Sequence, residues 1–230
     1  MKQLVTQGIV LSRTDYGEAD RIVTLLTPEQ GKLRLMVRGV RRMKSKMAGG
    51  IELFSVSDLT YIKGKGEIGT LISARLNKYY REIVKDIDRV QLGYELIKLA
   101  NRVTEDNPEA EYFTLLNEAF QALNDPTIDP ELIRAWFQCR LLKQAGHSPN
   151  LKTDSDDQPL TTTAKYNFDF ENMAFMPHPA GNFTADDIKV LRLLFSSHSP
   201  ASIGRVQGVG KLINECAPLI MTMMHNHLRV

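Results

Sequence analysis

The sequence has little cysteine. Only Cys139 and Cys216 occur among its 230 residues, and both lie in apolar segments of helical periodicity. This placement favours two buried small side chains over a disulfide framework. No Cys-x-x-Cys pair is present to hold zinc or to carry out redox chemistry. A hydrophobic content of 43% is enough for a substantial core, which we expect to be divided between two modest domains.

Long apolar runs are also missing. No segment approaches the roughly 18–20 apolar residues that a membrane span needs. The first ten residues, MKQLVTQGIV, show neither the apolar stretch nor the cleavage site of a signal peptide. We therefore expect a cytoplasmic protein that does not contact membranes.

Motifs for catalysis are absent as well. There is no P-loop, no Gly-x-Gly-x-x-Gly after a strand and no Gly-x-Ser-x-Gly. His225-Asn226-His227 spells a nuclease-like triplet, but it ends an apolar helix and has no second motif. Asp154, Asp156 and Asp157 lack the glycine and the glutamate that complete a calcium loop. No catalytic constellation and no cofactor site emerges, so the sequence favours a binding module over an enzyme.

Charge is distributed unevenly along the chain. The net charge is +2, yet residues 1–85 carry 16 Lys and Arg against 8 Asp and Glu, and the remainder carries 13 against 19. A basic N-terminal third joined to an acidic remainder suggests a nucleic-acid face on the first part and a different role for the second.

The most basic stretch runs from Gly31 to Lys46. Its first half alternates between apolar residues (Leu33, Leu35, Val37) and mostly basic ones (Lys32, Arg34, Met36, Arg38), which predicts a half-buried strand. A loop from Gly39 to Gly50 follows, and no Asp or Glu occurs between Glu29 and Glu52. Such a strand and loop are typical of a groove that tracks a nucleic-acid backbone. A solvated face that protects a sheet edge is the alternative.

Five short strands are expected in the first 80 residues, with a bend or bulge at Gly8. Their ranges are Leu4–Arg13, Arg21–Leu26, the basic strand, Leu53–Lys63 and Ile68–Leu76. Five strands with the longest connection between the third and the fourth fit a small closed barrel. The OB-fold is the commonest such barrel among single-strand nucleic-acid binders, and an SH3-like barrel is its rival.

The pattern turns helical after Tyr80. We assign residues 1–80 to the barrel and residues 81–230 to a helical domain with a hairpin excursion near residues 152–180. Lys152–Lys165 is expected as a loop and Tyr166–Met176 as the hairpin. The fold class is therefore α+β. Helices are expected at Asp88–Thr104, Ala110–Leu123, Pro130–Ala145 (with Gly146 as C-cap), from Thr184 onward, Pro200–Arg205 and Lys211–Leu228.

Two stretches carry a resemblance to a known family. The run DYGEADRIVTLLTPEQGKLRLMVRGVRRMKSKMAGG, followed by ELFSVSDLTYIKGKGEIGTL, closely resembles the N-terminal domain of RecO, the bacterial recombination mediator and single-strand annealing protein. The resemblance covers residues 4–80 and continues more weakly through LLKQAGHSPNL and the terminal helices. It implies an N-terminal OB-fold and a C-terminal helical domain, in agreement with the periodicity.

The chain departs from this family at one place. Many RecO proteins carry a four-cysteine zinc site after the segment that corresponds to LLKQAGHSPNL. The matching positions here are Asp154, Asp157, Pro177 and Ala180, and none is a thiol. Structural zinc needs Cys or His in tetrahedral sets, so we expect no metal. Packing of Phe168, Phe170 and Phe175 should hold the hairpin instead.

The resemblance implies binding of single- and double-stranded DNA, annealing of complementary strands, and work with RecR and the single-strand-binding protein SSB to load the recombinase RecA. A nucleoid-associated location in the cytoplasm follows. Tyr61 is suggested for base stacking. The DNA-binding candidates are Lys32, Arg34, Arg38, Arg41, Arg42, Lys44, Lys46, Arg75, Lys78 and Arg81.

The family also implies capture of the acidic, apolar tail of SSB. Such a tail needs an apolar pocket rimmed by cations, for which Arg134, Trp136, Arg140 and Leu141 are the candidates. Two alternatives remain open: a protein-interaction adaptor whose basic loop is only a solvated rim, and an RNA-binding OB protein.

Overall fold

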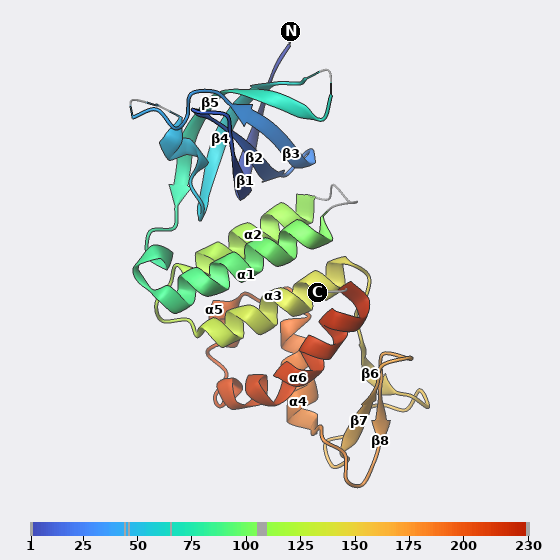
Figure 1. Ribbon diagram of the computed structural model, residues 1–230. Coiled ribbons are helices and arrows are strands. Elements are labelled where there is room, and N and C mark those ends of the chain that lie inside the picture. The colour runs from blue at the N-terminus through green and yellow to red at the C-terminus, as the bar shows by residue number, and fades with distance from the viewer. Residues whose placement is uncertain (1, 44, 46, 65, 105–109, 229–230) are drawn as a thin grey trace. The chain divides into compact units, whose positions relative to one another are not determined.

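The computed structural model describes residues 2–43, 45, 47–64, 66–104 and 110–228 (Figure 1). The chain forms two compact units, Met1–Asp125 and Pro126–Val230. The division proposed from the sequence, at Tyr80, marks the end of the barrel within the first unit. Two helices that follow the barrel belong to the same unit.

The first unit contains a closed five-stranded barrel. The strands are β1 (Gln3–Tyr16), β2 (Asp20–Thr27), β3 (Gly31–Val37), β4 (Ser55–Ile62) and β5 (Ile68–Tyr79), in the order β1-β2-β3-β5-β4. The pairs are antiparallel except β3–β5, which is parallel and closes the barrel. This Greek-key closure confirms the OB-like architecture that the sequence predicted.

The alternation of the basic strand is confirmed. Leu33, Leu35 and Val37 are buried in the barrel, together with Leu25 and Tyr61 among others. Residues 34, 36 and 38 consequently point away from the core, because successive side chains on a strand face opposite sides.

The bend expected at Gly8 lies elsewhere. The irregularity of β1 falls between Val10 and Ser12, where its pairing with β2 shifts register. Gly8 serves close packing instead, since a Cβ there would lie 2.6 Å from Cδ1 of Leu59. A glycine inside a strand pattern indicates either situation, and the sequence does not distinguish them.

Helices cover one end of the barrel. After the short 3-10 helices η1 (Ala48–Ile51) and η2 (Ile83–Lys85), α1 (Ile87–Val103) and α2 (Ala110–Leu123) pack against each other and against β1 and β2. The rings of Phe54 and Phe120 pack edge-on, with their centroids 5.6 Å apart. A Cβ on Gly93 would lie 2.5 Å from the Phe54 ring, so this glycine lets α1 approach it closely.

The second unit is helical with one small sheet. Its helices are α3 (Pro130–Gln144), α4 (Ala185–Leu194), α5 (Pro200–Ile203) and α6 (Val209–Leu228). Thr184 and Asp187 form a reciprocal capping box at the start of α4, as the sequence predicted. Gly146 takes a φ of +83° just after α3, in agreement with its expected capping role.

The sheet of the second unit has three strands rather than two. The expected hairpin is present as β7 (Tyr166–Asp169) and β8 (Ala174–Pro177), and Phe168 packs edge-on against both Phe170 and Phe175. The prediction of a loop at Lys152–Lys165 is wrong for its first residues, because they belong to the strand β6 (Asn150–Asp154), which pairs with β8. Polar side chains hold this segment, so it shows no apolar alternation: the Asp154 carboxylate accepts hydrogen bonds from the backbone of Asp156 and Gln158.

Two histidines meet where α3 and α6 end. The rings of His147 and His227 stack with centroids 4.6 Å apart and planes inclined by 26°. Burial, and secondly the neighbouring His227, lower the pKa of His147 below its ordinary value of 6.5. A histidine whose pKa is depressed in the folded state stabilises the fold above its unfolded pKa, and that stability is lost as the pH falls through the folded pKa.

We therefore expect the stability of the second unit to decrease as the pH is lowered below 6.5. Urea denaturation at a series of pH values measures this. His147→Phe keeps the stacking ring and removes the titration, so it should flatten the pH dependence. His225→Gln on exposed α6 surface is the matched control and should retain it. An unchanged pH dependence in His147→Phe would contradict the assignment.

Candidate nucleic-acid interface

The outer face of β1, β2 and β3 forms one continuous surface. The strand register places Thr14, Ile22 and Met36 side by side, and Arg34 lies next to Met36 along β3. Ile22 and Met36 are half-buried, whereas Arg34 is exposed. In OB-folds the face of strands 2 and 3, together with neighbouring loops, binds oligonucleotides. This surface thus combines apolar contact area with a cation in the position where that fold class binds nucleic acid.

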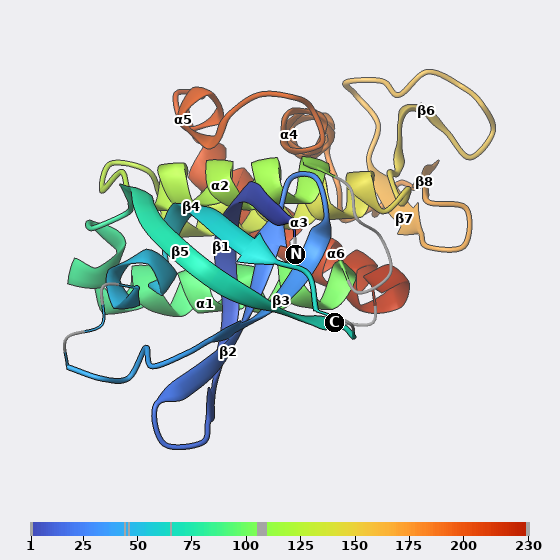
Figure 2. The same cartoon turned by 90° about the horizontal axis from the view of Figure 1, so that it is seen from above.

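The loop from Gly39 to Gly50, called the basic loop below, is fixed at its start to the turn that joins β1 and β2. The backbone N–H of Gly39 donates to Oδ1 of Asp20 at 2.7 Å, and that of Arg41 donates to the carbonyl of Ala19 at 3.0 Å. The Arg41 side chain also donates to the carbonyl of Gly17 at 3.3 Å. The start of the loop is therefore held beside the β1–β2 turn (Figure 2). Arg38, Arg41 and Arg42 belong to this part of the chain and are exposed.

One carboxylate holds the turn and the loop together. Asp15 accepts a hydrogen bond from Nε of Arg21 at 2.8 Å, and its other oxygen lies 3.4 Å from Nε of Arg41. The hydrogen bond from Arg21 and the charges of Arg21, Arg41 and Arg13 lower the pKa of Asp15. Asp15 thus remains ionised and bridges the two arginines at neutral pH.

The far end of the loop rests on β5. A Cβ on Gly50 would lie 2.6 Å from the Cβ and carbonyl oxygen of Ala74, so the chain passes in direct contact with that strand. Arg75 and Lys78 are exposed on the same strand, and Nζ of Lys78 lies 4.9 Å from the centroid of the Tyr80 ring. The basic loop therefore runs from the β1–β2 turn to the basic half of β5.

The predicted cations differ in their environments. Lys32 is half-buried and donates to the carbonyl of Asn101, which ties β3 to α1. Nη1 of Arg34 lies 3.8 Å from Oε2 of Glu67. Within the described part of the chain, Arg38 and Arg42 are exposed and have no acidic partner. Lys44 and Lys46 lie outside the described residues. The exposed members of the predicted set are Arg34, Arg38, Arg41, Arg42, Arg75, Lys78 and Arg81.

The suggestion of Tyr61 for base stacking is wrong. Tyr61 is 1% exposed and belongs to the barrel core. Among the described residues, the exposed aromatic side chain on the outer face is Tyr16, at the end of β1 and beyond the predicted strand range Leu4–Arg13. Arg13 and Arg21 were not among the predicted cations, and their pairing with Val23 and Val37 places them on the core-facing side of the strands, opposite to Thr14 and Ile22. The alternation of Ser12, Thr14 and Tyr16 continues past the expected strand end, and this signal could have revealed Tyr16.

The predicted partner-binding residues are distributed between core and surface. Trp136 is 1% exposed and its Nε1 donates to the carbonyl of His198 at 2.9 Å, and Leu141 is fully buried. Nη1 of Arg140 donates to the carbonyl of Ser196 at 2.7 Å, and Arg134 pairs with Glu131. Trp136 and Leu141 thus belong to the core, and the two arginines are half-buried.

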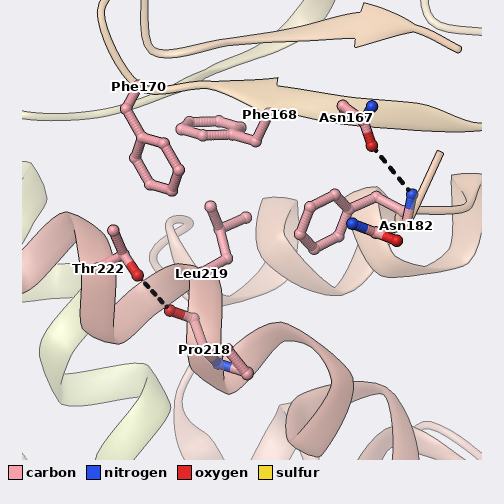
Figure 3. Close-up of a pocket in the computed structure, with 8 residues that line it drawn as sticks. Asn167, Phe168, Phe170, Asn182, Pro218, Leu219 and Thr222 are labelled. Atoms are coloured by element: carbon pink, nitrogen blue, oxygen red, sulfur yellow. Dashed lines mark hydrogen bonds between the residues drawn. The ribbon is translucent and has the colours of Figure 1, made fainter.

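A hollow of the second unit lies between its sheet and α6 (Figure 3). Its volume is about 380 Å³, and its lining carries no charged side chain. Two hydrogen bonds join lining residues: the backbone N–H of Asn182 donates to Oδ1 of Asn167 at 3.3 Å, and Oγ1 of Thr222 donates to the carbonyl of Pro218 at 2.9 Å. The lining consists of Asn167, Phe168, Phe170, Asn182, Phe183, Pro218, Leu219 and Thr222.

Neither metal ligands nor membrane spans stand out in the described residues. No group of three or more His, Cys, Asp or Glu side chains there is arranged to hold a metal ion. No described helix is both long enough and apolar enough to cross a bilayer.

Comparison with known proteins decides the family. Residues 1–80 match the model described as "Recombination protein O N terminal", and residues 84–202 match "Recombination protein O C terminal". This chain belongs to the RecO family. Membership supports a role in recombinational DNA repair, and the two RecO models together cover the barrel and most of the helical region.

Several RecO relatives support the same assignment. The DNA repair protein RecO of Halalkalibacterium halodurans is 31% identical over 198 residues, which are 82% of this chain and 76% of that protein. RecO of Dehalococcoides mccartyi is 31% identical over 70% of this chain and 64% of its own length. RecO of Roseiflexus is 34% identical over 64% of this chain and 51% of its own length.

Proposed function

We propose that this RecO-family chain binds single-stranded DNA across the outer face of β1–β3 and along the basic loop, and that it anneals complementary strands. One observation supports this most directly. Arg38 and Arg42 are exposed and have no acidic partner among the described residues, and they border the face that OB-folds use for oligonucleotides.

The physical basis is neutralisation of phosphate charge. Two DNA strands repel each other through their backbones, and cations that contact phosphates release condensed counterions and reduce that repulsion. Bond-making and bond-breaking are not required. The complementary strands then pair by themselves, and the duplex product is held by the same cations.

The wider role follows from the family. We propose that the chain acts with RecR to load RecA onto DNA coated with SSB, and that it recognises the acidic tail of SSB. These partners are macromolecules of DNA repair, and the names of the curated relatives, "DNA repair protein RecO", agree with that context. The proposed site of action is the nucleoid, in the cytoplasm.

The test is annealing of complementary strands, naked or coated with SSB, at low and physiological salt. We expect the chain to accelerate annealing of both substrates and to act more slowly at the higher salt concentration, because phosphate contacts weaken with salt. An RNA pair of the same sequence should anneal more slowly. Absence of acceleration on naked and coated DNA at low salt would contradict the proposal, and a preference for RNA would favour an RNA-binding protein.

A further inference from the structure

Tyr16 stands at the edge of the proposed DNA-binding surface. Its side chain is 56% exposed, although large aromatic side chains are usually buried where a core can accept them. It is the last residue of β1 and pairs with Asp20 across a turn in which Gly17 takes a φ of +57°. Strand alternation puts Tyr16 on the same face as Thr14 and Ile22.

Tyr16 also lies on the same side of the barrel as Arg38, one of the exposed cations without an acidic partner among the described residues. The pairing of β2 with β3 ends at Arg21 and Val37. Continuing this register by one residue places Arg38 opposite Asp20, so Tyr16 and Arg38 lie on either side of β2, about 10 Å apart. An aromatic ring and a cation on the same face suit a single-stranded nucleic acid, because a base can stack on the ring while a nearby phosphate meets the cation.

The turn that carries Tyr16 is held in place before any ligand arrives. Asp15, the residue before it, is hydrogen-bonded to Arg21 and lies close to Arg41, and Gly17, the residue after it, accepts a hydrogen bond from Arg41. Both chain neighbours of Tyr16 are therefore fixed to basic side chains. Ordering this segment on binding costs less conformational entropy when it is already fixed.

Two other tyrosines are exposed among the described residues, and each lies elsewhere. Tyr94 packs edge-on against Phe54, with centroids 5.4 Å apart, and Tyr79 lies at the end of β5. Neither is on the face formed by β1, β2 and β3. Tyr16 is thus the exposed tyrosine of the described chain that combines this face with neighbouring cations.

We propose that Tyr16 stacks on an unpaired base of bound DNA and that this contact makes the protein bind single strands more tightly than duplex of the same length. In a duplex both faces of each base are covered by neighbouring bases, so the ring finds no free π-face inside it. A base–aromatic stack changes affinity by about 5- to 150-fold. This inference rests on the proposed function, because it presupposes DNA on the outer face.

The first test compares variants by fluorescence anisotropy with a labelled single-stranded oligonucleotide and a duplex of the same length. Tyr16→Ala should weaken single-strand binding by about 5- to 150-fold and leave duplex binding within about twofold. Tyr16→Phe should bind like the wild-type chain, because the ring and not the hydroxyl makes the stack. Tyr94→Ala, at an exposed tyrosine of α1, is the matched control and should leave both affinities unchanged.

The second test uses Tyr16→Trp as a reporter. The single natural tryptophan, Trp136, is buried and its Nε1 is hydrogen-bonded, so an indole at position 16 is the exposed emitter. Single-stranded DNA should quench its emission, and duplex DNA should quench it less. An unquenched emission at saturating oligonucleotide would overturn the inference.

The outcomes distinguish a failure of the stacking inference from a failure of the proposed DNA-binding function. If the wild-type chain binds single strands and Tyr16→Ala binds them equally well, the stacking role is wrong and the proposed function stands. If Tyr16→Ala loses single-strand and duplex binding by the same factor, the specificity role is wrong. If the wild-type chain binds neither DNA, both proposals fail together.

Discussion

The double variant Arg38→Glu/Arg42→Glu is expected to bind single-stranded DNA on the order of 100-fold more weakly than the wild-type chain at physiological salt. Both side chains are exposed and have no acidic partner among the described residues, so the variant removes two phosphate contacts and adds two repulsive charges. Fluorescence anisotropy with a labelled oligonucleotide measures the loss.

A control with the same change in net charge is Lys152→Glu/Arg205→Glu, at two exposed positions of the second unit. It should reduce affinity by less than about threefold, because only the general attraction to DNA is weakened. Arg41 is left intact, since it holds the loop to Asp15 and the carbonyl of Gly17. Equal losses in the two double variants would contradict a specific role of the loop.

The variant Arg89→Ala is expected to destabilise the first unit by about 2–4 kcal/mol. Arg89 is only 6% exposed, and its Nη1 donates to the carbonyls of Leu123 at 2.8 Å and Asp125 at 3.0 Å. Truncation leaves these carbonyls, at the C-terminal end of α2, without that donor and opens a cavity beside α1. Urea denaturation followed by circular dichroism measures the free energy of unfolding.

The matched control for Arg89 is Lys98→Ala, an exposed position of the same helix. Its free energy of unfolding should stay within about 0.5 kcal/mol of the wild-type value. An Arg89→Ala variant that unfolds like the control would show that the buried guanidinium contributes nothing net to the packing of α1 on α2.

The sequence predicted the barrel because its strands obey simple alternation. Leu33, Leu35 and Val37 enter the core while Arg34 faces out, and this period of two can be read directly from the residues. The helices could also be predicted from the sequence, and the predicted range of α2, Ala110–Leu123, agrees with the structure. Local patterns are sufficient where one face of an element is apolar.

The site was less predictable because it depends on contacts between segments. Tyr61 and Tyr16 are both tyrosines in strands, and only the closure of the barrel buries the first and leaves the second exposed. The contact between Arg41 and Asp15 joins a loop residue to the end of β1, and it cannot be inferred from the periodicity of the sequence. The strand β6 was missed for a similar reason, since polar side chains and its pairing with β8 hold it.

The predicted partner site also depends on burial that the sequence does not reveal. Arg134, Trp136, Arg140 and Leu141 were grouped because an apolar pocket rimmed by cations suits an acidic, apolar tail. In the structure the Arg140 guanidinium lies 5.8 Å from the Trp136 ring centroid, and Trp136 and Leu141 are buried. Spacing along a helix indicates which residues share a face. It does not tell whether that face is covered.

The salt dependence of single-stranded DNA binding tests the central claim most directly. Seven exposed cations on the proposed path predict a slope of about −5 for log affinity against log salt concentration, or a loss of about 1,000-fold between about 50 and 200 mM salt. The neutral variant Arg38→Gln/Arg42→Gln should have a slope shallower by about 1.4, because it removes two phosphate contacts. Identical slopes for the two proteins would contradict DNA binding on the basic loop.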